Sequence, residues 1–204
     1  MIYFTSDLHL GHNNIIKLSD RPFRNIDEMN RALIQNWNAV VSPRDEIYIL
    51  GDLSFRKNAE DVNEWLKKLN GIKYLIKGNH DKYLDSPDFE KQAFGWVKDY
   101  FVLPYNKIRF VLFHYPIHEW DGYFQETVHL HGHVHEKLIQ GQHEQKERRA
   151  INVGVDVSGF MPVSIDTVCD LAFNGKWRCP DCAFINDEDD NACQNAKCFY
   201  QIYD

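Results

Sequence analysis

The chain lacks the long apolar segments that membrane and secreted proteins carry. None of its 204 residues lies in a run that approaches the roughly 18–20 apolar residues of a membrane-spanning helix. The N-terminal stretch MIYFTSDLHLGH has no basic segment followed by a long apolar one, so no signal peptide is predicted. We therefore expect a soluble cytoplasmic protein without a membrane partner.

Positive charge is also scarce. The chain has 23 Lys and Arg against 30 Asp and Glu, a net charge of −7. Proteins that coat nucleic acid bind its phosphates with clustered Lys and Arg, so nucleic acid is a possible but not a favoured partner. A local site could still bind phosphate through metal ions. The 44% hydrophobic content is enough for the core of one substantial domain and a small appendage.

Cysteine is rare over most of the chain and crowded at its end. Cys169 stands alone, and the last 26 residues contain the other four: Cys179, Cys182, Cys193 and Cys198. Two cysteine pairs separated by ten residues are typical of a structural zinc site in a reducing compartment. We predict a small zinc-binding module over residues 175–204, which needs its metal to fold because so short a segment buries little core.

Strand and helix patterns alternate in the first half of the chain. Strands are expected at 2–8, 46–53 and 73–81, and amphipathic helices at 25–41 and 58–71, with a short helix near Pro87. The second half has four strand-like runs, at 96–103, 107–115, 127–134 and 150–157. A polar loop is expected at 135–150 and a short helix within 162–173. This order predicts an α/β domain over residues 1–173 with two sheets, or one sheet wrapped by a second.

Polar side chains follow or end several of these apolar strands. They are Asp7, His9, Asp52, Asn79, His80, Asp81, His114, His133 and His135. Ligands of open α/β sheets bind beyond the carboxyl ends of the strands, so we expect these side chains to meet at one rim. The mixture of carboxylate, imidazole and amide groups suits Mn, Fe or Zn better than Ca. A carboxylate could also bridge two cations about 3.5–4 Å apart.

Simpler interpretations exist for individual residues. A single His or Asp at a strand end usually caps or satisfies a local group. The run 127–134 could be an amphipathic strand with its histidines in water; we keep that interpretation for His129 and leave His131 open. Arg21 and Arg24 could clamp a second phosphate, or they could belong to a solvated turn. The joint pattern at successive strand ends is what favours a metal site.

The motifs D-x-H, G-D, G-N-H-D, a later H and G-H-x-H, in this order over residues 1–173, resemble the calcineurin-like metallophosphoesterase superfamily. The resemblance implies two β-sheets packed face to face with helices outside. It implies one metal held by Asp7, His9, Asp52 and His135, and a second held by Asp52, Asn79, His114 and His133, with Asp52 as the bridge. His80 would approach the substrate and support the leaving group, and Asp81 would orient His80.

The implied activity is hydrolysis of a phosphate monoester or diester, with a slight preference for a nucleotide-type phosphodiester. Two divalent cations would lower the pKa of a shared water, which would attack phosphorus as hydroxide. Two alternatives stay open: a catalytically idle scaffold that recruits partners through the zinc module, and a nuclease that the module directs to RNA or single-stranded DNA. The complete ligand set favours the enzyme.

The C-terminal segment resembles a RanBP2-type zinc finger. The resemblance rests on Trp177, Cys179, Cys182, Asn186 and Cys193, but four residues rather than the usual two separate the last two cysteines. Such fingers bind single-stranded RNA or protein. Because this segment is acidic, a protein partner or a capping role fits it better than tight RNA binding.

Overall fold

The computed structural model describes residues 1–56, 58–125, 127–135, 149–173, 177–178 and 185–186. The four clustered cysteines lie outside these residues, so the zinc module remains a prediction. Of the C-terminal segment, the structure describes only two short strands, β10 (Trp177–Arg178) and β11 (Ile185–Asn186), which pair antiparallel. Among the described residues, no helix is long and apolar enough to cross a membrane.

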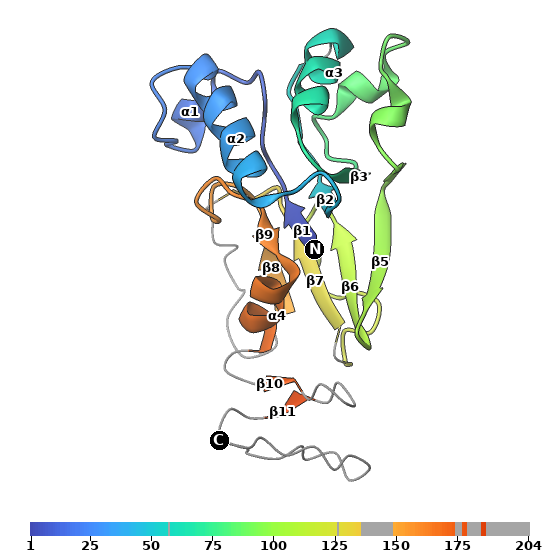
Figure 1. Ribbon diagram of the computed structural model, residues 1–204. Coiled ribbons are helices and arrows are strands. Elements are labelled where there is room, and N and C mark those ends of the chain that lie inside the picture. Colours follow the sequence, from blue (N-terminus) through green and yellow to red (C-terminus); the bar gives the residue numbers. More distant parts are fainter. Residues whose placement is uncertain (57, 126, 136–148, 174–176, 179–184, 187–204) are drawn as a thin grey trace.

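In the described part of residues 1–173, nine strands form two sheets (Figure 1). The first has the order β4-β3-β2-β1-β9 and contains β1 (Ile2–Thr5), β2 (Glu46–Leu50), β3 (Ile72–Ile76), β4 (Trp96–Lys98) and β9 (Val163–Ser164). It is parallel except for β9, which runs antiparallel to β1. The second has the order β5-β6-β7-β8 and contains β5 (Tyr100–Tyr105), β6 (Ile108–Phe113), β7 (Thr127–His131) and β8 (Ala150–Asn152). Within it β6, β7 and β8 are parallel.

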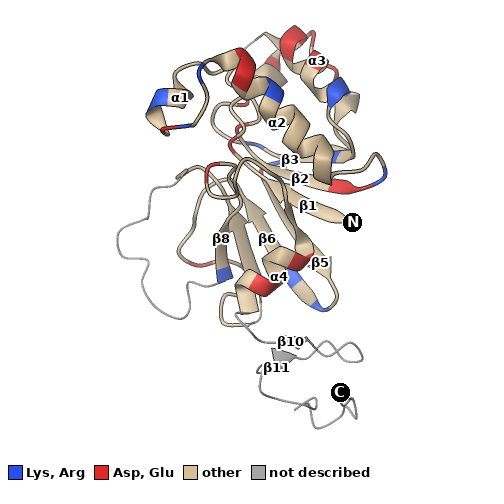
Figure 2. Ribbon diagram, turned by 60° about the vertical axis from the view of Figure 1, so that its left-hand side comes forward, with Lys and Arg blue, Asp and Glu red and all other residues tan. Residues whose placement is uncertain are grey.

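Four helices accompany the sheets. They are α1 (Ile15–Leu18), α2 (Ile26–Val40), α3 (Ala59–Lys68) and α4 (Ile165–Phe173). Asn25 begins α2 as its N-cap, because its side-chain oxygen accepts a hydrogen bond from the Glu28 amide at 2.9 Å. Figure 2 shows most of the charged residues on the helices and the loops, whereas the strands carry very few. This distribution is what sheets buried on both faces require.

Strand β2 shows how the sequence divides the core into two layers. Ile47 and Ile49 join the cluster that packs against α2 and α3, whereas Tyr48 and Leu50 join the cluster between the two sheets. Successive strand residues point to opposite faces, so this apolar run supplies both layers at once. Across the second layer, the rings of Phe4 and Phe110 lie 6.0 Å apart, which places the two sheets face to face. The predicted two-sheet α/β fold is confirmed.

Several local predictions differ from the structure. The run 96–103 is not one strand, because it leaves the first sheet after β4 and enters the second as β5. The short helix expected near Pro87 is replaced by two 3-10 turns, Lys82–Asp85 and Lys91–Ala93. The interpretation of His129 as a solvent-facing residue is wrong. Its ring is fully buried, where Nδ1 donates to the Val111 carbonyl at 3.1 Å.

Candidate metal centre

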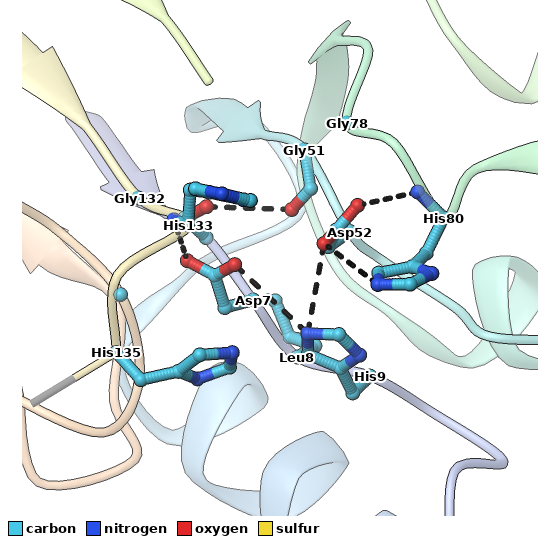
Figure 3. A network of polar contacts seen from close by, with 12 residues as sticks. Asp7, Leu8, His9, Gly51, Asp52, Gly78, His80, Gly132, His133 and His135 are labelled. Carbon is cyan, nitrogen blue, oxygen red and sulfur yellow. Dashed lines mark hydrogen bonds and ion pairs between the residues drawn. The ribbon is translucent and has the colours of Figure 1, made fainter. Parts of the chain in front are cut away.

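The polar residues that follow the strands meet at one rim of the two sheets (Figure 3). Asp7, Asp52 and His80 come after β1, β2 and β3 of the first sheet. His114 and His133 come after β6 and β7 of the second. Both sheets are parallel at these strands, so their carboxyl ends lie side by side and deliver the side chains to a common space.

Two groups of three residues there could each hold a metal ion. Asp7, His9 and His135 form the first, which we call the Asp7 cluster, and Asp52, His114 and His133 form the second, the Asp52 cluster. Within each cluster the possible ligand atoms all lie within 4.8 Å of one another. The structure thus brings together six of the seven predicted ligands in two sets, and the seventh, Asn79, contacts the Asp52 cluster.

Asp52 lies between the two clusters, as a bridging ligand should. Its Oδ2 is 3.5 Å from Nε2 of His114 and 3.7 Å from Nε2 of His9, which belongs to the other cluster. Its Oδ1 accepts a hydrogen bond from the His80 amide at 2.8 Å, which holds the carboxylate plane in place. Figure 3 shows the carboxylates of Asp7 and Asp52 among the surrounding imidazole rings.

The backbone is strained at these positions. Nine non-glycine residues of the described chain have positive φ, and five of them are predicted ligands: Asp7 (57°), His9 (52°), Asp52 (53°), His133 (71°) and His135 (51°). Such conformations cost on the order of 1–3 kcal/mol each and persist where the surrounding structure enforces them. They turn each side chain sharply inward at the end of its strand. Hydrogen bonds between segments, such as the Asp7 amide to the Gly51 carbonyl at 3.0 Å, hold these turns.

Glycines leave the space that the carboxylates occupy. A Cβ on Gly132 would lie 2.2 Å from Oδ2 of Asp7. A Cβ on Gly78 would lie 2.2 Å from Oδ1 of Asp52, and one on Gly51 would lie 2.4 Å from Nδ1 of His114. Each glycine of the G-D, G-N-H-D and G-H-x-H motifs is therefore required by close approach to a predicted ligand.

Unpaired acceptors indicate that the site fits cations. Oδ1 of Asp7 and Nε2 of His9 are buried without a hydrogen-bond partner, although buried polar atoms are nearly always paired. The His114 Nδ1–H donates to the Leu50 carbonyl at 2.7 Å, which leaves Nε2 unprotonated. That Nε2 faces Oδ1 of Asn79 at 3.1 Å, so two acceptors oppose each other. One divalent cation in each cluster would satisfy these atoms.

The pKa shifts agree with this interpretation. Burial lowers the pKa of His9, His114 and His133, so these imidazoles stay neutral, which is the form that binds a metal. Burial raises the pKa of Asp7 to about 7, which reflects the cost of keeping a carboxylate away from water without a cation beside it. For His135, burial opposes charging, but the hydrogen bond to Asp156 and the charges of Asp7 and Asp156 raise its pKa.

Asp81 does not contact His80 as the sequence suggested. Its two oxygens accept hydrogen bonds from the backbone amides of Gly78 (2.8 Å), Asp52 (2.9 Å) and Leu53 (2.9 Å). Within the described chain, no hydrogen bond joins Asp81 to the His80 ring. Asp81 instead fastens the end of β3 to the turn that carries Asp52.

Arg21 and Arg24 do not form a phosphate clamp. Arg24 is exposed and pairs with Glu28 one helical turn away, with a 3.1 Å ion pair. The Arg21 side chain is fully buried and pairs with Asp156 at 2.7 Å. Sequence reasoning missed Asp156, because a lone Asp in the run AINVGVDV has no motif and its partner lies 135 residues away. Asp156 in turn accepts a hydrogen bond from Nδ1 of His135 at 2.6 Å.

Aromatic rings border the site on its open side. Phe55, 43% exposed, stacks on His12 with ring centroids 3.9 Å apart and an interplanar angle of 10°. It also lies 4.9 Å from the His80 ring. Tyr115, 36% exposed, packs edge-on against His133 at 4.6 Å. The sequence carried no signal for either residue beyond its position shortly after a predicted ligand.

Comparisons with known proteins agree with this geometry. A family model described as Calcineurin-like phosphoesterase matches residues 1–152. The chain is 40% identical over 177 residues to the uncharacterized protein MJ1445 of Methanocaldococcus jannaschii, covering 86% of this chain and 93% of that protein. It is 29% identical over 195 residues to the Gene 66 protein of Mycobacterium phage L5, covering 83% and 92%. A crystal structure of the protein of unknown function AQ665 from Aquifex aeolicus has a TM-score of 0.66 at 29% identity, covering 84% of this chain and 98% of that one.

Proposed function

Because the chain belongs to the calcineurin-like phosphoesterase family, it is a metal-dependent phosphoesterase, and we propose that its substrate is a phosphodiester of the nucleotide type. The observation that carries the hydrolytic part of this proposal is the pair of ligand clusters with Asp52 between them, together with the unpaired acceptor atoms of Asp7 and His9. A phosphodiester carries a charged phosphoryl group that two cations can neutralise, and it leaves room on both sides for organic substituents.

We assign to this site two divalent cations, Mn, Fe or Zn, bound by the seven ligands that were predicted from the sequence. When bound, two such cations would neutralise the phosphoryl oxygens and lower the pKa of a shared water from about 15.7 towards about 7. The contribution of the chain is to hold the ligand atoms. Asp52 keeps one oxygen between the clusters, and the His114 Nδ1–H, bonded to the Leu50 carbonyl, directs Nε2 inward.

His80 is assigned the delivery of a proton to the leaving oxygen. Its ring is about one-third exposed, and Nε2 lies 4.0 Å from Oδ2 of Asp52, between the metal ligands and solvent. Its amide is tied to Asp52 Oδ1, so the ring stays beside the bridging carboxylate. A histidine in this position can donate to an alkoxide that departs toward solvent.

Phe55 supports a nucleotide-type substrate because it presents an exposed ring next to His80. The ring is already stacked on His12, so its position is set before a substrate arrives. Stacking of a base on an aromatic side chain contributes about 1–3 kcal/mol, and it accepts any base because every base has a π-face. Tyr115 packs against His133 of the Asp52 cluster. It offers a second aromatic ring to the second organic substituent of the diester.

The catalytic part of the proposal is tested with bis-p-nitrophenyl phosphate and added Mn²⁺. Asp52→Asn should lose activity and two-ion binding, because an amide nitrogen replaces one of the oxygens between the clusters. Asp166→Asn makes the same chemical change at an exposed position of α4 and should leave both unchanged. Full turnover by Asp52→Asn would reject the bridge. Absence of hydrolysis by the unchanged protein across several metals and esters would favour the idle scaffold.

The substrate preference is tested with two diesters that share one leaving group, thymidine 5′-(p-nitrophenyl phosphate) and methyl p-nitrophenyl phosphate. Phe55→Ala should lower kcat/KM for the thymidine ester by roughly 5- to 150-fold, the equivalent of 1–3 kcal/mol, with little effect on the methyl ester. Phe55→Leu keeps an apolar side chain without a ring and should behave like Phe55→Ala. Equal losses for both esters would argue against a stacked base.

A further inference from the structure

Arg21 occupies an enclosed position in which every one of its donors is used. A guanidinium has five N–H groups. Nε donates to Oδ1 of Asp156 at 2.7 Å, and Nη2 donates to Oδ2 of Asp156 at 2.8 Å and to the Asp7 carbonyl at 2.7 Å. Nη1 donates to the Leu8 carbonyl at 2.9 Å and contacts the Met29 sulfur at 3.5 Å. No donor is left for a substrate.

Asp156 connects this guanidinium to the Asp7 cluster. Oδ2 of Asp156 accepts from both Arg21 and Nδ1 of His135, the latter at 2.6 Å. That hydrogen bond keeps the proton of His135 on Nδ1 and leaves Nε2 as the atom available to a cation. The segment that carries Asp156 is itself fastened beside Asp7, because the Val155 amide donates to the Ser6 carbonyl at 3.0 Å.

We propose that Arg21 and Asp156 are positioning residues that prepare the Asp7 cluster, and only that cluster, to hold its cation. The inference rests on the proposed function, since it concerns one of the two ions assigned there. Arg21 holds the backbone turn of Asp7 through the carbonyls of Asp7 and Leu8, and Asp156 sets the ring and the tautomer of His135. Asp7 and His135, the first and the last predicted ligands in the sequence, are thus both held by the Arg21–Asp156 pair.

A purely stabilising role fits the contacts less well. Burying an ion pair removes two charges from water, and replacing such a pair with apolar residues is often neutral or favourable for stability. We therefore explain the Arg21–Asp156 pair by the groups it positions, the backbone turn of Asp7 and the ring of His135. Two members of the Asp52 cluster have separate supports, namely the Leu50 carbonyl on Nδ1 of His114 and the carboxylate of Asp81 on the Asp52 amide. The third, His133, donates its amide to Oδ2 of Asp7 at 2.9 Å and, within the described chain, forms no hydrogen bond or ion pair with Asp156. Loss of Asp156 should therefore weaken one ion and spare the other.

Asp156→Asn is the main test, measured by titrating metal-free protein with Mn²⁺ against a chromophoric chelator. The amide keeps the size of the side chain but removes its charge and turns one acceptor into a donor. A nitrogen in the Oδ2 position would face both Nη2 of Arg21 and Nδ1 of His135, and a nitrogen in the Oδ1 position would face Nε of Arg21, so in either orientation the amide opposes a donor of Arg21. We expect one of two ions to bind about 10- to 100-fold more weakly, while the other keeps its affinity. Asp166→Asn is the control with the same chemical change at an exposed site.

A double-mutant cycle separates positioning from general stability. In a His135→Ala background, Asp156→Asn should cause much less further loss of Mn²⁺ affinity, because it acts through the ring that is already gone. Arg21→Lys provides a second variant should Asp156→Asn fail to fold. Lysine has three donors on one nitrogen and cannot replace the four hydrogen bonds that Arg21 makes to Asp156 and the two carbonyls, so the same single ion should weaken.

Nitrogen-15 NMR of the metal-free protein gives a readout that does not require the ions. At a pH at which its ring is neutral, His135 should be protonated at Nδ1 in the unchanged protein, and it should lose that preference in Asp156→Ala, which has no acceptor for Nδ1. Wild-type affinity for both ions in a folded Asp156→Asn or Arg21→Lys protein, or a His135 tautomer that is unchanged in Asp156→Ala, would overturn the positioning role. Failure of the unchanged protein to bind two ions, with the tautomer change intact, would instead count against the proposed function.

Discussion

Gly78 offers a sharp test of the geometry at the candidate metal centre. Its backbone conformation is open to any residue, so only space forbids a side chain there. A Cβ would lie 2.2 Å from Oδ1 of Asp52 and 2.4 Å from the Asp52 amide nitrogen. Ordinary contact begins at 3.4 Å, so in Gly78→Ala the new Cβ and the carboxylate oxygen of Asp52 must move apart by about 1.2 Å. This displacement affects the residue on which both clusters depend.

The expected consequences follow from that displacement. A misplacement of about 1 Å at a reacting centre can cost about 100-fold in rate. Inserting a methyl group into a packed site costs about 1–3 kcal/mol of stability. Gly78→Ala should therefore fold, lose about 1–3 kcal/mol in urea denaturation and hydrolyse bis-p-nitrophenyl phosphate roughly 100-fold more slowly with saturating Mn²⁺.

Gly95→Ala is the matched control. Its Cβ would lie 2.5 Å from Cε1 of Tyr74, so the clash is similar, but the neighbour is a ring in the layer between the sheets. This variant should lose stability and keep the specific activity of its folded fraction. Near-normal activity in Gly78→Ala, or an equal loss in Gly95→Ala, would refute the claim that Gly78 is there to make room for Asp52.

Three further predictions concern the metal, the buried histidine and the longest helix. Mn²⁺ should raise the Tm of metal-free protein with increasing concentration, because only the folded chain assembles the ligands, and Asp7→Asn should reduce this rise in a thermal shift assay. Burial lowers the pKa of His129 to about 4, whereas the unfolded chain has a value near 6.5. The contribution of His129 to the stability of metal-free protein should therefore fall by up to about 3 kcal/mol between pH 6.5 and 4, because the unfolded state binds the proton first. His129→Gln should flatten this part of the pH profile of urea denaturation, and an unchanged slope would contradict the assignment. Asn25→Ala should cost about 1 kcal/mol through loss of the α2 cap, measured in the same assay, whereas exposed Asn14→Ala, which lacks a cap hydrogen bond, should cost little.

Much of the site was predictable because the candidate ligands form short motifs in the sequence. Carboxylate and imidazole residues at strand ends follow a short-range pattern, and the carboxyl ends of parallel strands meet by topology alone. The glycines of G-D and G-N-H-D could also be recognised in the sequence. The structure was needed to show that Gly78 leaves the space that the Asp52 carboxylate occupies. The positive φ of Asp7 and His135 was not visible, since neither residue type requires it.

The roles of buried polar partners were not predictable in the same way. Asp81 follows His80 in the chain and was expected to orient it, yet its oxygens accept from the amide of Gly78 in the same loop and from the amides of Asp52 and Leu53 in another segment. Likewise, nothing local marks Arg21 as buried rather than exposed. In both cases the partner is chosen by position in space, because a buried charge must find donors or acceptors wherever the fold provides them.

The amino-acid order alone determined the fold class, the kinds of ligand and their order along the rim, because periodicity and residue chemistry act over a few neighbours. The tertiary structure alone decided that 96–103 would cross between the sheets, that His129 would be buried and that Arg21 would reach Asp156. These outcomes depend on packing and on hydrogen bonds between residues far apart in the chain, and no short stretch of sequence contains that information.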